Sequence, residues 1–424
     1  MKKNKKGVLI IIIFVLVIAI LLSIKQQKYQ QQQNYQKQQN INILKNIKSH
    51  FNEYIKTNKI TNLYDKDENI IGKINTNISL ILEKSIITTD TKYFKLQEFE
   101  NTYIKYDDVI PSKKENKSDR YKNYIPYNLN IKTKSTTNFY DEFNNLKYSL
   151  NKSFDMPIIV KGNDYYGVSF NDELLYIKKD DVKEIYEHHN SKLLNTNGVA
   201  VLNYHAFFDE NNIEEKKKCI STICMSKSQF QSELDYFKKI NIFTITMSEL
   251  EMYMDGKIQL PKSVLITIDD GGMTKIAVDL LTEYKMNATI FLITSRFNPD
   301  EYYKTDFIEL HSHSHNLHSP GICPGGQGAG IKCLQEDIIL KDLETSRNLL
   351  NNTKAFCYPF YEYNEYSTRL LKKAGFSMAF IGEVNTTYGY KLAESNGDKY
   401  HIPRFVMFNY TTINDLEEYF NEIK

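Results

Sequence analysis

The stretch Val264-Leu265-Ile266-Thr267-Ile268-Asp269-Asp270-Gly271 (VLITIDDG) indicates the fold class of the second half of the chain. Its five apolar or β-branched residues in a row are typical of a strand buried on both faces, as in a parallel sheet. Similar runs stand at residues 199–202 and 288–293, and helical patterns lie around them at residues 228–240, 273–284, 336–350 and 366–374. Alternating strands and helices predict an α/β fold, an open sheet or a barrel, from about residue 198.

Polar side chains follow these predicted strands at the point where each one ends. The run at residues 199–202 leads into Asn203-Tyr204-His205, and the run at residues 264–268 leads into Asp269-Asp270. A later segment, residues 311–318 (HSHSHNLH), holds four of the nine histidines. Because α/β folds build their sites at the carboxyl ends of strands, we expect these side chains to lie close together.

The carboxylate pair and the histidine cluster together indicate a metal site. An Asp-Asp-Gly sequence alone is a common turn, and a His-rich segment alone can be a solvated loop. Two histidines and one carboxylate with open positions are, however, a recurrent catalytic metal arrangement. A His-Glu-x-x-His sequence is absent, which excludes that class of metalloprotease. Metal-assisted hydrolysis is therefore the leading class of chemistry.

At this point the sequence resembles a known family. Residues 264–271 resemble the first motif of the NodB-type polysaccharide deacetylases, carbohydrate esterase family four, and residues 312–318 (SHSHNLH) resemble the second. Four residues between His313 and His318 are typical of the PgaB/IcaB-type poly-N-acetylglucosamine deacetylases. Other branches have three intervening residues, which would select His311 and His315 here.

Three more segments extend the resemblance over roughly residues 198–424. Residues 200–205 (AVLNYH) resemble the first strand of that branch, and residues 402–404 (IPR) resemble a late strand. Tyr358-Pro359-Phe360 matches the third motif, although Tyr361 stands where a glycine is often found. The resemblance implies an irregular (β/α) barrel of the NodB deacetylase type.

The resemblance also implies a metal and a base. Asp270, His313 and His318 would hold a divalent metal, with zinc as the expected ion, and would leave positions for water and the substrate carbonyl oxygen. The metal would lower the pKa of its water and polarise the acetamide. Asp269 would take the proton from the attacking water.

Three further roles follow from the same resemblance. His205 would give a proton to the departing sugar amine. A backbone N–H near Tyr358 would stabilise the oxyanion together with the metal. Arg404 would hold Asp269 ionised and oriented.

The beginning of the chain predicts a membrane anchor. Four lysines within residues 1–6 precede residues 7–24, which are uncharged and almost entirely apolar, and this length is enough to cross the hydrocarbon core. A cleaved signal peptide is the alternative, but its apolar run is shorter, and no Ala-x-Ala site follows here. We expect a cytoplasmic tail (1–6), a single transmembrane helix (7–24) and a Gln-rich stalk (25–50), with the rest of this bacterial cell-membrane protein extracytoplasmic.

A repeat precedes the catalytic part. Residues 63–65 (LYD) are echoed by 139–141 (FYD), and residues 103–109 (YIKYDDV) by 176–182 (YIKKDDV). Short β-branched and aromatic runs predict two small all-β domains, at residues 58–110 and 125–187, which resemble bacterial SH3-like modules. Binding of a cell-wall polymer and a passive spacer role both stay open.

Charge and cysteine content narrow the remaining possibilities. The formal net charge of +2 is too balanced to predict a nucleic-acid partner. All five cysteines follow residue 218, and the absence of a C-x-x-C sequence excludes a zinc ribbon. Outside the membrane a disulfide can form, and Cys323 with Cys333 is the first pair to expect, across a Gly-rich rim loop at residues 319–333.

These observations predict a membrane-anchored enzyme that removes N-acetyl groups from GlcNAc residues of an extracytoplasmic polysaccharide. The motif branch favours poly-N-acetylglucosamine as the substrate. The wall-type modules and the anchor favour peptidoglycan or another envelope glycan. A third alternative is a non-catalytic glycan-binding protein on a deacetylase scaffold.

Overall fold

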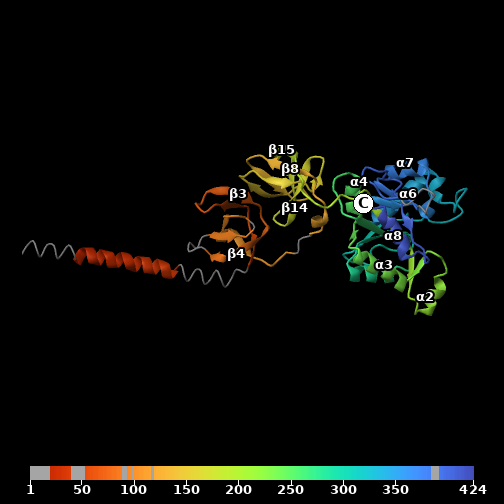
Figure 1. Cartoon of the computed structure of the whole chain (residues 1–424), viewed down its shortest axis with the longest axis horizontal. Helices are drawn as coiled ribbons and strands as arrows, with labels where there is room; N and C mark the ends of the chain where they lie inside the picture. The colour runs from red at the N-terminus through yellow and green to blue at the C-terminus, as the bar shows by residue number, and fades with distance from the viewer. Residues whose placement is uncertain (1–19, 40–52, 88–92, 98, 116–118, 383–390) are drawn as a thin grey trace, which may run out of the picture. The chain divides into compact units, whose positions relative to one another are not determined.

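The structure is a computed structural model, and it describes residues 20–39, 53–87, 93–97, 99–115, 119–382 and 391–424. Residues 20–39 form a helix, drawn in red in Figure 1. Among the described residues, no helix is both long enough and apolar enough to cross a membrane. The predicted tail and most of the predicted anchor, residues 1–19, lie outside the described residues, as do residues 40–50 of the predicted stalk. The anchor stays a prediction.

The chain divides into two compact units. A β unit contains the described parts of Met1–Ser118, Ile131–Met156 and Val168–Ile185. An α/β unit contains Asp119–Asn130, Pro157–Gly167 and Tyr186–Lys424.

The β unit is built around an antiparallel sheet, in which ten strands follow the order β14-β9-β10-β3-β2-β6-β5-β4-β1-β7. These strands are β1 (Tyr54–Thr57), β2 (Thr61–Tyr64), β3 (Ile70–Ile74), β4 (Ser79–Ile87), β5 (Tyr93–Leu96), β6 (Tyr103–Lys105), β7 (Val109–Pro111), β9 (Thr137–Tyr140), β10 (Leu146–Leu150) and β14 (Glu173–Lys178). Short strands in the same part of the chain are β8 (Leu129–Thr133), β11 (Asp155–Pro157), β12 (Val160–Lys161), β13 (Tyr165–Phe170) and β15 (Val182–Glu187). Side chains alternate between the two faces of a strand, so Leu63, Phe139 and Tyr148 point into the core, fully buried.

The repeat seen in the sequence is also a repeat of local structure. Asp65 accepts hydrogen bonds from the backbone N–H of Asn69 and from its side-chain amide, at 2.9 and 3.0 Å. Asp141 makes the same two contacts with Asn145, at 2.8 and 3.0 Å. An aspartate that bonds to nearby backbone groups fixes a turn, so each half closes its hairpin in the same way. The likeness to SH3 modules and the domain boundaries stay predictions.

The α/β unit contains a parallel sheet in the order β24-β23-β22-β21-β20-β16-β25. Its strands are β16 (Ala200–Tyr204), β20 (Ser263–Ile268), β21 (Ala288–Leu292), β22 (Ile308–Ser312), β23 (Ala355–Cys357), β24 (Met378–Phe380) and β25 (Phe405–Val406). Shorter strands are β17 (Ala206–Phe208), β18 (Cys224–Ser226) and β19 (Phe243–Thr244). A parallel bridge between Phe380 and Ile402 brings the two ends of the sheet together. The predicted α/β fold is confirmed in this coarse form, a parallel half-barrel.

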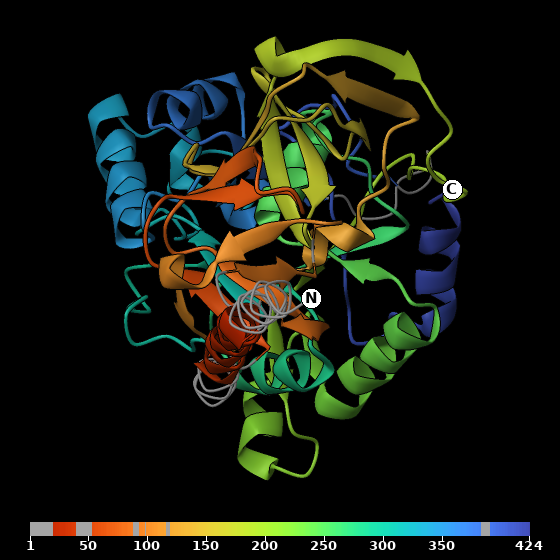
Figure 2. The same ribbon diagram turned by 90° about the vertical axis from the view of Figure 1, so that its left-hand side faces the viewer.

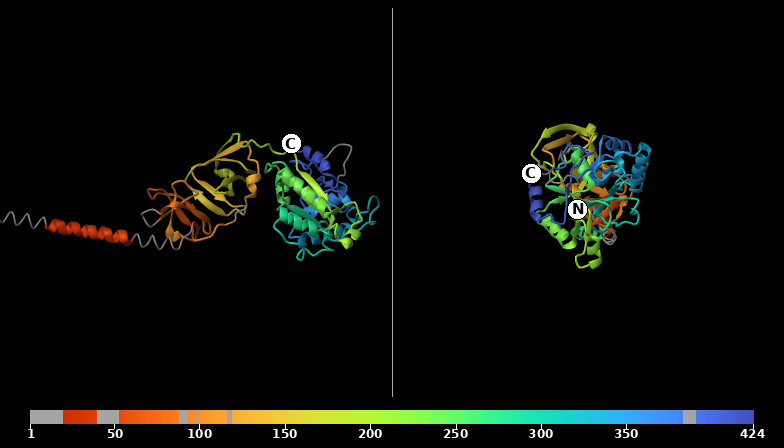
Figure 3. Two further views of the ribbon diagram at one scale, coloured as in Figure 1. Left: turned by 60° about the horizontal axis from the view of Figure 1, so that its bottom comes forward. Right: turned by 90° about the vertical axis from the view of Figure 1, so that its right-hand side faces the viewer.

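Helices surround this sheet (Figure 3). They are α2 (Ile213–Lys218), α3 (Lys227–Lys239), α4 (Met247–Met254), α5 (Lys275–Tyr284), α6 (Glu336–Leu349), α7 (Glu365–Lys373) and α8 (Ile413–Asn421). Phe237 of α3 and Phe420 of α8 pack together in the core, with ring centroids 5.6 Å apart. Helices α6 and α7 lie side by side (Figure 2) and are joined at the surface by the Glu336–Arg369 ion pair. Every residue of β16 and of β20 is buried, as expected for central strands of a covered parallel sheet.

Two short segments from earlier in the chain belong to the α/β unit by their contacts. Arg120 forms an ion pair with the buried carboxylate of Glu249 at the start of α4, at 2.5 Å. The Ile125 N–H donates to the Gln259 carbonyl oxygen at 2.9 Å. These contacts attach residues 119–130 to the segment that leads into β20.

The cysteines form two disulfides within the α/β unit. Cys323 is bonded to Cys333, which confirms the expected pair. Cys219 is bonded to Cys224, a pair that the sequence analysis did not select. Cys357 is a buried free thiol at the end of β23.

Candidate active site

Four parallel strands end at the candidate site. His205 follows β16, the pair Asp269-Asp270 follows β20, His313 follows β22, and Cys357 ends β23. Because these strands run in the same direction, their carboxyl ends meet at one edge of the sheet. The topology therefore gathers residues that are more than 150 positions apart in the sequence.

Asp270 lies in a strained turn. Its φ is 72°, in the left-handed region, and the next residue, Gly271, has a φ of 92°. A Cβ atom on Gly271 would lie 2.4 Å from Leu292 Cδ1, so this position needs glycine both for its conformation and for space. Strained backbone of this kind is concentrated at functional sites.

The Asp270 carboxylate lies between two imidazoles. Its Oδ1 atom is 3.4 Å from Nε2 of His313 and 3.4 Å from Nε2 of His318. His313 Nδ1 is 2.9 Å from the Cys357 carbonyl oxygen. A carbonyl oxygen only accepts, so Nδ1 carries a hydrogen, and Nε2 is the ring nitrogen that faces Asp270.

This arrangement fits a divalent cation. Asp270 Oδ1 is buried and has no hydrogen-bond partner among the described residues. The ligand atoms of Asp270, His313 and His318 all lie within 4.8 Å of one another. Two neutral imidazole nitrogens and a carboxylate oxygen are a zinc donor set that leaves further positions open.

The protonation of His318 and Asp270 suits metal binding. Burial favours the neutral form of His318 and, with the nearby His313, lowers its pKa to about 4. Burial opposes ionisation of Asp270, but the neighbouring His313 outweighs it, and the pKa of Asp270 lies below its usual value. A neutral His318 and an ionised Asp270 are the forms that bind a metal.

Helix α6 supports the turn that carries the two histidines. Asp342 accepts hydrogen bonds from the backbone N–H groups of His315 and Asn316, at 2.8 and 2.6 Å. These bonds fix the chain between His313 and His318. Nothing in the sequence near these histidines indicates Asp342, which lies 24 positions beyond His318.

The other two histidines of the cluster are placed elsewhere. His311 Nδ1 is 2.6 Å from the Thr353 hydroxyl, and His315 Nδ1 is 3.0 Å from the Thr294 hydroxyl. The structure thus brings His313 and His318 to Asp270 and leaves His311 and His315 on other partners.

Arg404 holds the second carboxylate of the pair. Its two terminal nitrogens donate to Oδ1 and Oδ2 of Asp269, at 2.8 and 2.9 Å. Burial alone would raise the pKa of Asp269, but the Arg404 charge outweighs it, and the pKa lies well below the usual value. A second group of possible ligands, Asp269 with His313 and Cys357, is blocked for a cation, because the Arg404 guanidinium already contacts Asp269 and the Cys357 sulfur.

His205 completes the set of predicted site residues. Its side chain is buried, its Nε2 atom is 3.1 Å from the Tyr361 hydroxyl, and its Nδ1 atom has no hydrogen-bond partner among the described residues. Burial favours the neutral ring and lowers the pKa of His205.

Residues 257–379 match the family model described as polysaccharide deacetylase. This part of the chain is a polysaccharide deacetylase domain of the NodB type. Poly-beta-1,6-N-acetyl-D-glucosamine N-deacetylase of Staphylococcus aureus (strain N315) is 28% identical to this chain over 239 residues, which are 50% of this chain and 79% of that protein. The protein of the same name from Staphylococcus epidermidis is 26% identical over 241 residues, or 50% and 80% of the two chains. The chain is a deacetylase hydrolase.

Two solved structures are also similar to the chain. The de-N-acetylase of Aggregatibacter actinomycetemcomitans has a TM-score of 0.44 and 17% identity, over 52% of this chain and 99% of that one. IcaB from Ammonifex degensii has a TM-score of 0.43 and 20% identity, over 54% and 99% of the two chains.

The Tyr358 backbone has a partner within the sheet of this deacetylase domain. The Tyr358 N–H donates to the Phe380 carbonyl oxygen at 3.2 Å, and this bond joins the end of β23 to β24. The phenol oxygen lies 3.1 Å from the Thr368 hydroxyl on α7. The N–H of Tyr358 itself is used within the sheet, and a backbone N–H near Tyr358 as an oxyanion donor stays a prediction.

The Gly-rich loop at residues 319–333 is fastened beside the deacetylase site. The Ala329 N–H donates to the Glu362 carboxylate at 2.9 Å, and the Lys332 ammonium lies 2.7 Å from the same carboxylate. Glu362 directly follows Tyr361, so this carboxylate and the Cys323–Cys333 disulfide together hold the loop next to the third motif.

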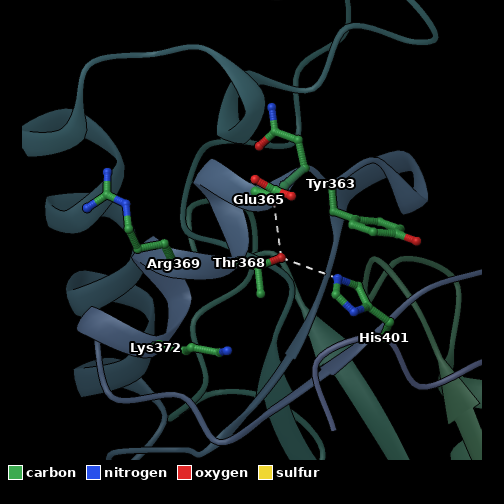
Figure 4. A pocket seen from close by; sticks show the side chains of 7 residues that line it. Tyr363, Glu365, Thr368, Arg369, Lys372 and His401 are labelled. Atoms are coloured by element: carbon green, nitrogen blue, oxygen red, sulfur yellow. Dashed lines mark hydrogen bonds between the residues drawn. The ribbon is translucent and has the colours of Figure 1, made fainter. Parts of the chain in front are cut away.

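A separate cavity of about 410 Å³ lies beside helix α7 (Figure 4). The Thr368 hydroxyl lies within it, 3.1 Å from the Asn364 carbonyl oxygen and 3.3 Å from His401 Nε2. Exposed side chains at its rim include Tyr363 and Arg369, and Arg369 is paired with Glu336. None of the candidate metal ligands lines this cavity.

Proposed function

We propose that this deacetylase hydrolyses the N-acetyl groups of GlcNAc residues in an extracytoplasmic polysaccharide of the poly-β-1,6-N-acetylglucosamine type. We also propose that it needs a divalent metal, with zinc as the expected ion. The relatives' names support the substrate class. One observation carries the metal dependence: a buried carboxylate oxygen of Asp270 faces two imidazole nitrogens and has no hydrogen-bond partner among the residues that the structure describes.

Asp270, His313 and His318 would hold the cation. When bound, it would polarise the acetamide carbonyl group and lower the pKa of a water molecule, the chemistry that zinc supplies in hydrolases. The Cys357 carbonyl oxygen keeps the His313 ring in the orientation and tautomer that a ligand needs.

Asp269 would act as the general base. It would accept a proton from the attacking water as the oxygen adds to the carbonyl carbon. Arg404 keeps Asp269 ionised and prevents the carboxylate from rotating, because both oxygens are held by the same planar guanidinium.

His205 would act as the general acid. A sugar amine leaves readily only after it gains a proton, because the free amide anion is a very poor leaving group. The buried Nδ1 atom of His205 has no hydrogen-bond partner among the described residues, so it is the ring nitrogen that would give the proton to the substrate nitrogen. The C–N bond then breaks, and acetate and a free amine are the products.

We also propose that the enzyme works outside the cell membrane, held by residues 7–24. The apolar run after four lysines supports this topology, and so do two disulfides, which persist in oxidising compartments. Recovery of the protein in the membrane fraction, with protease access only from outside, is the expected result. A mature protein found in the medium and beginning near residue 25 would identify the segment as a cleaved signal.

Acetate release tests the proposed activity. The purified protein should release acetate from a β-1,6-linked N-acetylglucosamine oligomer, and the Asp269→Asn variant serves as the matched inactive control. Faster release from peptidoglycan would instead support the alternative wall substrate. Glycan binding without any acetate release from either polymer would support the non-catalytic alternative and contradict the proposal.

A further inference from the structure

The Tyr361 hydroxyl lies between two buried side chains, Asn203 in strand β16 and His205 directly after that strand. It donates a hydrogen bond to Asn203 Oδ1 at 2.7 Å, and it lies 3.1 Å from His205 Nε2. The sequence motifs assign no role to Tyr361, which stands where the family often has a glycine.

The direction of each hydrogen bond follows from Asn203. Its side-chain nitrogen donates to the Tyr204 carbonyl oxygen at 3.2 Å, which leaves Oδ1 as the atom that faces Tyr361. A phenol has one hydrogen, and that hydrogen goes to Oδ1. The Tyr361 oxygen can then only accept from His205, so Nε2 of His205 carries a hydrogen.

The Tyr361 side chain is fixed in this position. Phe360 and Tyr361 have φ values of 55° and 62°, an uncommon pair of left-handed residues outside glycine. A Cβ atom on Gly382 would lie 2.6 Å from the Tyr361 ring, and the Arg404 guanidinium lies 5.5 Å from the ring centre on another side. Burial also raises the pKa of the phenol well above its usual value, so the hydroxyl keeps its hydrogen at neutral pH.

We propose that Tyr361 is a positioning residue that holds His205 in the Nε2–H form and makes Nδ1 the nitrogen that gives the proton to the leaving amine. This inference rests on the proposed role of His205 as the general acid. In the charged ring both nitrogens carry hydrogen: Nε2–H donates to Tyr361, and Nδ1–H faces the substrate.

The proton transfer leaves the ring in the form that Tyr361 stabilises. The Nδ1–H bond breaks, a new N–H bond forms on the substrate nitrogen, and the electron pair of the broken C–N bond stays on that nitrogen. The imidazole becomes neutral with its hydrogen on Nε2. A transfer from Nε2 would instead break the hydrogen bond to the buried Tyr361 hydroxyl.

Nitrogen NMR of the intact zinc-loaded protein, labelled at histidine, tests the inference directly. His205→Gln identifies the signal by its loss. At a pH above the pKa of His205, the neutral His205 ring of the wild-type protein should carry its hydrogen on Nε2. Tyr361→Phe should move a large share of that hydrogen to Nδ1, whereas Tyr363→Phe, two residues away on the exposed rim of the α7 cavity, should leave the signal unchanged.

Kinetics give the second measurement. Tyr361→Phe should lower kcat about tenfold, the order of one lost hydrogen bond, and leave KM and metal content nearly unchanged. A wild-type ring with its hydrogen on Nδ1, or a Tyr361→Phe ring that keeps it on Nε2, would overturn the inference. The wild-type spectrum is decisive even if Tyr361→Phe does not fold. If the wild-type protein releases no acetate but its His205 ring carries the hydrogen on Nε2, the proposed function is refuted. The positioning of His205 by Tyr361 is then not refuted.

Discussion

Arg404 binds Asp269 through two parallel hydrogen bonds of 2.8 and 2.9 Å, and each residue exposes only 1% of its surface. The adjacent carboxylate, Asp270, faces His313 and His318 instead. Two neighbouring aspartates therefore lie in opposite environments. One is held by a fixed positive charge, and the other faces a place for a cation.

Substitution of each aspartate by asparagine should separate the two roles. Asp269→Asn cannot accept a proton, so we expect it to keep its metal while acetate release falls by about 10²–10⁴-fold, the usual worth of a general base. Asp270→Asn should lose metal affinity, with activity partly restored by excess zinc. Metal content and acetate release are measured on the same samples. An Asp269→Asn enzyme within a few-fold of wild type at neutral pH would mean that the base lies elsewhere.

Arg404→Lys should lower activity without removing the metal. Lysine keeps the positive charge but offers no planar pair of donors, so Asp269 loses one of its two fixed hydrogen bonds and gains freedom to rotate. We expect kcat to fall about tenfold or more and zinc stoichiometry to stay at the wild-type value. Unchanged kcat in a folded, zinc-loaded variant would show that the orientation of Asp269 does not matter.

Alanine substitutions in the histidine cluster test which pair binds the metal. His313→Ala and His318→Ala should each lose bound zinc, because their Nε2 atoms face Asp270. His311→Ala and His315→Ala are matched controls that should keep it, because their Nδ1 atoms face Thr353 and Thr294. Metal analysis decides the question, and loss of zinc from His311→Ala with retention in His318→Ala would reverse the assignment.

The sequence predicts those parts of the site that lie in short continuous motifs. The pair Asp269-Asp270 and the residues from His313 to His318 follow apolar strands directly, so their convergence follows from the α/β pattern alone. The disulfide between Cys323 and Cys333 is likewise close in sequence.

Other features depend on contacts between distant segments, and no local pattern encodes them. Asp342 supports the histidine turn from a helix that begins 18 residues after His318. Tyr361 reaches Asn203 across more than 150 residues. The bond from the Tyr358 N–H to the Phe380 carbonyl oxygen likewise depends on the pairing of separate strands.

A buried glutamate next to the site predicts a specific dependence of stability on pH. Glu233 of α3 accepts a hydrogen bond from Tyr204 at 2.8 Å, and burial raises its pKa from 4.5 to about 8. Its pKa is higher in the folded than in the unfolded protein, so its contribution is full below pH 4.5 and is lost as pH rises through about 8. The free energy of unfolding should therefore fall by up to about 5 kcal/mol from this group across that window.

Glu233→Gln isolates this effect. Glutamine cannot ionise and can still accept from Tyr204, so the variant should lose this part of the pH dependence and be more stable than wild type near pH 8. Denaturant unfolding at pH 5, 6.5 and 8 measures it. Parallel stability profiles for the two proteins would mean that Glu233 is ionised in the folded state at neutral pH.

Titration of metal-stripped protein with zinc is the most direct test of the proposed catalytic metal centre. Acetate release from a β-1,6-linked N-acetylglucosamine oligomer should be absent after chelation and should return in proportion to added zinc, with full activity at one ion per chain. Asp270→Asn should bind no zinc at that ratio. Full acetate release by protein that contains no metal would contradict the claim that Asp270, His313 and His318 form a catalytic metal centre.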